Sequence, residues 1–68
     1  MNQQQLNELL LAVRKLADSA DAIAKIMVLY VRTETDPVRH AMYMRILNAM
    51  RDAALSLRHT LSGAPTLA

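Results

Sequence analysis

Few side chains in this chain of 68 residues could do chemistry. The chain has no Cys, its two histidines are His40 and His59, and its one glycine is Gly63. On a single helix the two histidines would lie about five turns apart, too far to share a metal ion within one chain. One glycine cannot form a glycine-rich phosphate loop, and no serine has an evident base beside it. The sequence therefore predicts that the protein is not an enzyme, with no catalytic residues, no metal site and no cofactor.

Basic residues gather in residues 37–62, which contain a single acid, Asp52. Arg51 and Arg58 are one heptad apart and would share one side of a helix. In a dimer this row would double into a basic strip that follows phosphates, as in a Rop-like hairpin that binds RNA or DNA. However, the net charge is only +2, and Arg45 and Arg51 fall at different angles around the helix. A solvated helix face is the better interpretation, so nucleic-acid binding is kept as the alternative function.

The apolar residues repeat every seven positions in two stretches, which are separated by residues 33–37. Alternating steps of three and four place such residues on one side of a helix and are typical of a coiled-coil-like seam. Two helices with so short a connection can pack together only as an antiparallel hairpin. The stretches consist of Leu6, Leu9, Val13, Leu16, Ala20, Ile23, Met27 and Tyr30, and of His40, Tyr43, Leu47, Met50, Ala54, Leu57 and Leu61.

A capping residue marks the start of the first expected helix. Asn2 is a suitable N-cap for a helix over about residues 3–32, and Gln5 can complete a capping box with it. A turn at residues 33–36 follows. The chain thus predicts one all-α hairpin domain over residues 1–68.

The second expected helix covers about residues 37–62. Asp36 is a suitable N-cap and Pro37 a suitable first helical residue, because the amide that proline lacks would be unpaired there. Gly63 is expected in the left-handed conformation that ends many helices, and a short tail occupies residues 63–68.

A hairpin of this size is short of buried surface. Ordering the chain costs on the order of 100 kcal/mol, and the sequence has no Phe, Trp or Cys to compensate. The first helix also carries a wider apolar arc than one neighbour would cover. We therefore expect a homodimer in which two hairpins form a four-helix bundle. The residues assigned to the core or the dimer are Leu6, Leu9, Val13, Leu16, Ile23, Met27, Leu47, Met50, Leu57 and Leu61.

No stretch of the sequence resembles a membrane segment. The most apolar run, residues 22–31, is interrupted by Lys25 and is too short to cross about 30 Å of hydrocarbon. The first residues lack the basic segment of a signal peptide. We therefore expect a cytoplasmic protein without membrane contact.

The residues near the turn form the candidate partner-binding surface. Tyr30 is expected in the core, whereas Tyr43 fits a core position and a partner contact equally well. Met42 and Met44 flank Tyr43 and cannot both face inward, so at least one of them should be exposed near the turn. The predicted partner-binding residues are Arg32, Glu34, Asp36, Arg39, His40, Tyr43 and Met44.

Taken as a whole, the chain resembles the small anti-quorum-sensing (anti-activator) proteins encoded by transposable Pseudomonas phages. The resemblance covers most of the chain, but the first helix is a few residues longer here and extra aromatic residues of the family are missing. It is carried by a leucine-rich opening, a turn rich in Thr and acids, and the spacing of the second helix: Leu6, Leu9, Leu10, Val13 and Arg14, then residues 33–36, then Val38, Tyr43, Leu47, Ala53-Ala54-Leu55-Ser56-Leu57 and Leu61.

The resemblance implies a helical-hairpin homodimer without catalytic activity. Proteins of this family bind a LuxR-type acyl-homoserine-lactone receptor and block its transcriptional activity in the cytoplasm of the infected bacterial host. The family is also associated with binding the type IV pilus assembly ATPase. Tyr43 matches a family tyrosine that looks like a partner contact, so the resemblance implies that role for Tyr43 here.

Overall fold

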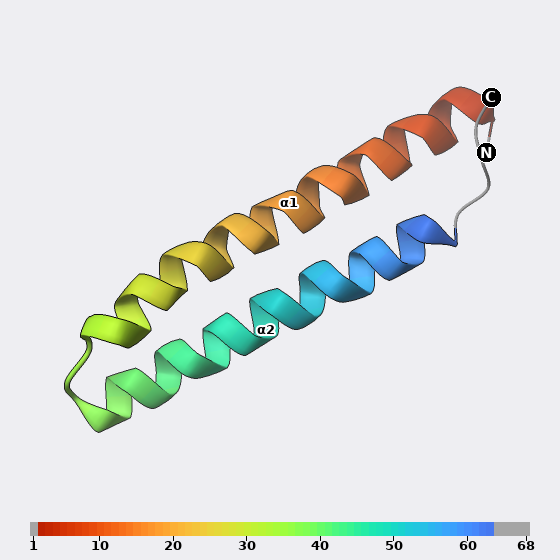
Figure 1. Cartoon of the computed structure of the whole chain (residues 1–68). Helices are drawn as coiled ribbons and strands as arrows, with labels where there is room; N and C mark the ends of the chain where they lie inside the picture. Colours follow the sequence, from red (N-terminus) through yellow and green to blue (C-terminus); the bar gives the residue numbers. More distant parts are fainter. Residues whose placement is uncertain (1, 64–68) are drawn as a thin grey trace.

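The computed structural model describes residues 2–63 of the chain. Within them lie two helices, α1 (Gln3–Thr33) and α2 (Pro37–Ser62). They run antiparallel, side by side, joined by residues 34–36 (Figure 1). The expected all-α helical hairpin is confirmed, and α1 extends one residue further than expected. Of the tail expected at residues 63–68, Gly63 is described and residues 64–68 lie outside the described residues.

The two N-terminal caps hold as the sequence predicts. The side-chain oxygen of Asn2 accepts a hydrogen bond from the backbone N–H of Gln5 at 2.8 Å, and the side-chain oxygen of Gln5 accepts from the N–H of Asn2 at 3.1 Å. Asp36 caps α2 by accepting from the N–H of Val38 at 3.0 Å, with Pro37 at the first helical position. Each cap satisfies amides that have no partner within the helix.

The expectation for Gly63 is wrong. Its φ of −88° and ψ of −2° are right-handed, and no residue among those described has a positive φ. The N–H of Gly63 donates to the carbonyl of His59 at 3.3 Å. This bond continues the right-handed winding by one more residue, so the helix ends without the left-handed turn for which glycine is usually needed.

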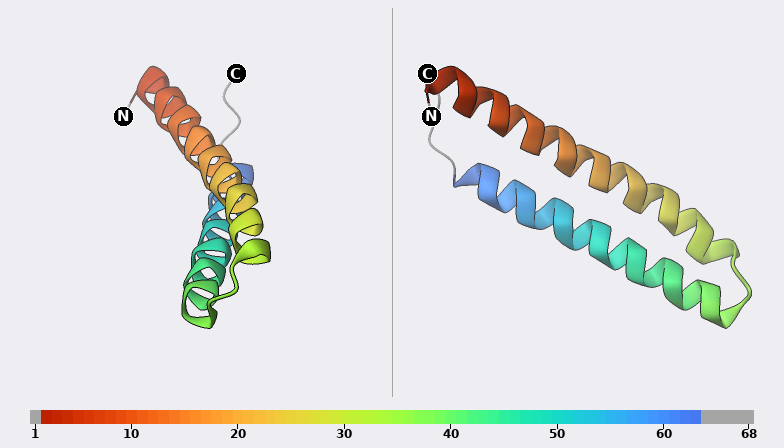
Figure 2. Two further views of the ribbon diagram at one scale, coloured as in Figure 1. Left: turned by 90° about the vertical axis from the view of Figure 1, so that its left-hand side faces the viewer. Right: turned by 180° about the vertical axis from the view of Figure 1, so that it is seen from behind.

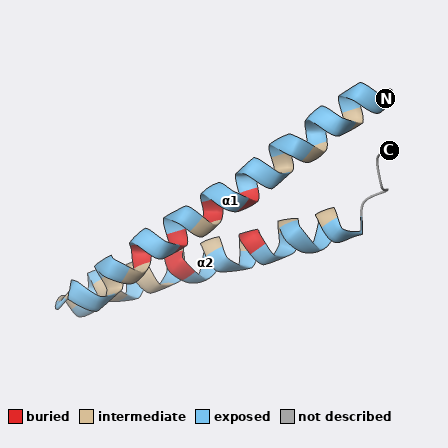
Figure 3. Ribbon diagram, turned by 45° about the horizontal axis from the view of Figure 1, so that its top comes forward, coloured by how far each residue is buried: buried red, intermediate tan, exposed pale blue. Residues whose placement is uncertain are grey.

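The contact between the helices is built on small side chains. The buried positions are Ala17, Ala20, Ala24 and Met27 on α1 and Leu47 and Ala54 on α2. The buried stretches of the two helices face each other (Figure 3). Alanines let two helix backbones approach closely, because interaxial distance depends on the side chains at the contact. The largest cluster lies in the turn half, where Val28, Val31, Tyr43, Met44, Ile46 and Met50 pack against Ala24, Met27 and Leu47.

The second apolar stretch faces α1 as predicted, but only half of the first one faces α2. All seven members of the second stretch are buried or partly buried. On α1, positions 6, 13, 20 and 27 are likewise buried or partly buried, whereas Leu9, Leu16, Ile23 and Tyr30 are exposed. The inward positions next to them are taken by Leu10, Ala17, Ala24 and Val31.

The hairpin is long and thin. Its extents are 51 × 16 × 15 Å, and the view from the turn shows the two helices crossing at an angle (Figure 2). Among the described residues no large side chain is fully buried. Neither of the two described helices has a stretch long and apolar enough to cross a membrane.

Candidate functional site at the turn

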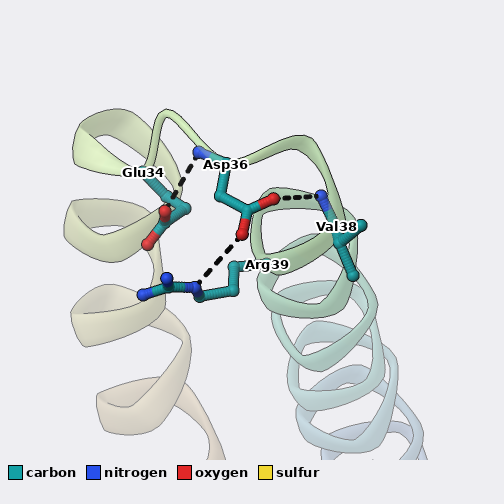
Figure 4. A network of polar contacts seen from close by, with 4 residues as sticks. All are labelled: Glu34, Asp36, Val38 and Arg39. Carbon is teal, nitrogen blue, oxygen red and sulfur yellow. Dashed lines mark hydrogen bonds and ion pairs between the residues drawn. The ribbon is translucent and has the colours of Figure 1, made fainter.

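A network of hydrogen bonds holds the connection between the helices. The N–H of Glu34 donates to the carbonyl of Tyr30 at 3.0 Å and ends α1. The Glu34 carboxylate accepts from the N–H of Asp36 at 3.1 Å, and the Asp36 carboxylate accepts from Val38 N–H and from Arg39 Nε at 3.0 and 3.3 Å (Figure 4). Three predicted site residues, Glu34, Asp36 and Arg39, are therefore brought together. Their mutual contacts pre-organise the turn.

The two tyrosines meet beside this network. The ring centroids of Tyr30 and Tyr43 are 5.6 Å apart, with the planes tilted by 51°, a common geometry for aromatic pairs. Tyr30 is 52% exposed, so its expected place in the core is wrong for the hairpin. Tyr43 is partly buried and packs against the cluster formed with Leu47. It therefore contributes to the core while one side remains open to solvent.

The remaining predicted site residues lie at different depths. Arg32 is exposed on α1, while His40 and Met44 are partly buried on α2. Met44 packs against the core cluster, and Met42 is the exposed methionine at 49%. One exposed methionine near the turn was expected, but the residue placed at the surface is Met42 and not Met44.

A depression on the outer face of α2 was not predicted. It is lined by Pro37, Val38, Ala41, Met42 and Arg45. Val38 is 77% exposed, more than any other large apolar side chain among the described residues. The signal was present in the sequence, because residues 38, 41, 42 and 45 fall on the helix side opposite Tyr43 and Leu47 once the inward row is fixed. We call this feature the turn-end depression.

Near the other end, one arginine joins the two helices. Arg58 on α2 pairs with Asp18 at 2.9 Å and with Asp21, both on α1. Its hydrogen bonds to Asp21 and then Asp18 raise the pKa of the Arg58 guanidinium. Of the two arginines that would start a basic strip, Arg51 and Arg58, one is therefore matched by two carboxylates of its own chain.

The described residues offer contact surface and no assembled reactive group. No group of three or more His, Asp or Glu side chains in residues 2–63 is placed to hold a metal ion. What the turn end offers instead is apolar surface next to Arg39 and Arg45 on a pre-organised connection, which is suited to binding. Comparisons of the chain with protein-family models, with curated proteins and with solved structures find no match.

Proposed function

We propose that the protein is a non-catalytic inhibitor that acts by binding another protein through the turn end of the hairpin. The observation that supports this most is Val38, a large apolar side chain left 77% exposed beside Arg39. Exposed apolar surface rimmed by polar residues is typical of protein contacts, in which Arg is among the residues that supply most of the affinity. The rigid turn adds to this, because little order has to be gained on binding.

The class of partner comes from the family resemblance. We propose a LuxR-type quorum-sensing activator as the principal target and the type IV pilus assembly ATPase as a second one. The protein would act in the cytoplasm of a phage-infected bacterium. The proposed contacts remain Arg32, Glu34, Asp36, Arg39, His40 and Tyr43, and we add Val38, Met42 and Arg45 to them. Met44 packs against the core cluster and is proposed to support these residues without contacting the partner.

We further propose that the active form is a homodimer, with two hairpins packed as a four-helix bundle. Among residues 2–63, the hairpin alone buries six residues well, four of which are alanines. A single interface of this kind buries little apolar surface compared with the conformational entropy that is lost when a chain of this length becomes ordered. A second copy would supply the missing burial.

A binding titration with two matched variants tests the proposed surface. Val38 and Leu55 are both exposed apolar residues of α2, at 77% and 68%, but only Val38 lies at the turn end. With a purified LuxR-type receptor bound to its acyl-homoserine lactone, we expect Val38→Ser to weaken binding at least tenfold and Leu55→Ser to leave it unchanged. Absence of binding by the wild type, or equal losses in both variants, would contradict the proposal. Circular dichroism checks that both variants keep their helices.

Nucleic-acid binding is the alternative function, and the ion pairs of Arg58 count against it. A strip that attracts phosphates needs free cations, and Asp18 and Asp21 already neutralise this one. A titration with duplex RNA and DNA across a salt series separates the two functions. Tight binding that weakens steeply with salt would favour the basic strip over the turn end.

A further inference from the structure

A second heptad row runs along α1 outside its contact with α2. It contains Leu9, Leu16, Ile23 and Tyr30, between 44% and 58% exposed, and Ile26 at 52%. The matching row on α2 contains two partly buried residues, Ile46 and Ala53, and five exposed ones, Arg39, Met42, Ala49, Ser56 and Thr60. Gln5, Ala12 and Ser19 complete the row on α1, and Arg39 beside the turn is the single charged residue of the two rows.

The two rows open on the same side of the hairpin. Each residue of a row comes directly before an inward residue: Ile23 before Ala24 on α1, for example, and Ile46 before Leu47 on α2. One residue is a rotation of about 100° around the helix axis. On each helix, stepping back one residue rotates the side chain by the same angle about that helix's own direction. Because the two helices point in opposite directions and face each other, this rotation turns both rows to the same side of the hairpin. We call this the uncharged side, because Arg39 at its turn end is its single charged residue.

The ion pairs of Arg58 support this geometry, because they join residues on the opposite side of the hairpin. Asp18, Asp21 and Arg58 each come directly after an inward residue, and their side chains meet across the two helices. Residues that follow an inward position therefore share the other side, which we call the charged side. It also holds Arg14, Lys25, Arg32, Asn48, Arg51 and Leu55 by the same rule.

We propose that a second copy of this chain covers the uncharged side. The choice of occupant follows from charge and from area. A face whose single charge lies at one end needs no oppositely charged partner and can pair with itself around a two-fold axis, which requires self-complementarity. The hairpin is 51 Å long and 16 Å wide, so one whole side offers a footprint of at most about 800 Å², similar to what each partner buries in a stable interface of ordinary size.

This inference rests on the dimer proposed above and assigns its interface. Covering the uncharged side places Tyr30 against the partner copy, because it ends the row on α1. It leaves Val38 and Arg45 free, since these lie on the outer face of α2. Met42 borders both surfaces, because it lines the turn-end depression and comes directly before the inward residue Tyr43. Ile23 and Val38 each lie on one of the two surfaces alone, so substitutions there disrupt the surfaces independently.

A pair of charge substitutions tests the assignment. Ile23→Glu puts a carboxylate on the uncharged side at a position that is 44% exposed in the hairpin, and Leu55→Glu puts one on the charged side at 68%. Sedimentation equilibrium of the wild type should give twice the chain mass of 7.6 kDa. We expect Leu55→Glu to keep that mass and Ile23→Glu to fall to the monomer mass at the same concentration.

The outcomes separate the interface from the dimer itself. A wild type that is a folded monomer overturns both. A dimer that survives Ile23→Glu but not Leu55→Glu overturns the assignment alone and leaves the dimer intact. Binding to the receptor is measured independently at the turn end, so its failure is not confused with either result.

A second measurement does not depend on how well Ile23→Glu folds. The chain has no cysteine, so single cysteines can be introduced without interference. Ser19→Cys lies on the uncharged side and Asn48→Cys on the charged side, and both positions are exposed in the hairpin. In the dimer, we expect the thiol at position 19 to react with a maleimide at least tenfold more slowly than the thiol at position 48. Equal rates in a protein of dimer mass would place the interface elsewhere.

Discussion

Tyr43 connects the interior of the hairpin to the surface near the turn. One side of it packs against the cluster of Ala24, Met27 and Leu47, and the ring also meets Tyr30. A residue of this kind contributes to stability through its buried ring and can reach a partner through its hydroxyl. The sequence left these two roles equally balanced. The structure shows the packing of the ring against the core cluster, and the partner contact stays a proposal.

Two substitutions of Tyr43 separate its roles. Tyr43→Ala removes the ring from the cluster and should lower the melting temperature clearly, because truncating a buried aromatic side chain costs about 3 kcal/mol or more. Tyr43→Phe keeps the ring and should leave the melting temperature nearly unchanged. If Tyr43→Phe still weakens receptor binding, the hydroxyl makes a partner contact. Equal melting temperatures for Tyr43→Ala and the wild type would show that the ring is not part of the core.

Predictions for single residues succeeded where only the neighbouring residues in the sequence matter. They failed where the depth of burial in the hairpin matters. Asn2 and Asp36 were identified as caps because a cap depends on only the next few residues. Met42 and Met44 could not be told apart in the same way. Each lies beside Tyr43 in the sequence, and a rotation of the helix by a few tens of degrees exchanges which of them is exposed.

At the scale of elements, α1 shows why an apolar stripe can be assigned to the wrong neighbour. It carries two adjacent stripes, and the sequence favours the one with the larger side chains, Leu9, Leu16 and Ile23. The contact with α2 uses the smaller side chains instead, Ala17 and Ala24 among them. Hydrophobicity alone predicts that a residue is buried somewhere, but close packing decides against which helix.

Ala17 offers a test of that close packing. It is fully buried between the helices, so Ala17→Leu forces them apart and should cost about 1–3 kcal/mol of unfolding free energy. Ala22→Leu on the exposed face of the same helix should change stability little, because a new side chain there meets solvent. Urea unfolding of both variants measures the difference. A neutral Ala17→Leu would indicate that the helices are less tightly packed than described.

At the scale of the whole molecule, the fold is simple and the proposed function depends on the surface that the fold leaves exposed. Length, periodicity and the position of Pro37 were sufficient to predict an antiparallel hairpin, since few other arrangements of two such helices exist. The turn-end depression was not predicted, because its residues are ordinary in type and become distinctive only through exposure. The proposed target protein was not predicted from the residue pattern, since it rests on the family resemblance alone.

The stability of the whole molecule should depend on its own concentration. If two copies fold together, mass action raises the melting temperature as the protein concentration rises. We expect melting curves followed by circular dichroism to shift upward steadily between about 5 and 500 µM, a hundredfold range that corresponds to about 2.7 kcal/mol of linkage. The turn-end variant Val38→Ser should show the same dependence. A melting temperature that does not change with concentration would mean that the isolated hairpin is stable alone.

The contact between Tyr30 and Tyr43 also gives the molecule an optical reporter of its own. The chain contains no Trp, so its intrinsic fluorescence comes from two phenol rings whose centroids are 5.6 Å apart. Both rings lie beside the turn, which means that the emission reports this end of the hairpin and not the end near Arg58. Docking of a partner, or a brief opening of the turn, would alter quenching between the rings. Events at the turn could therefore be followed in the unmodified protein, without an attached dye.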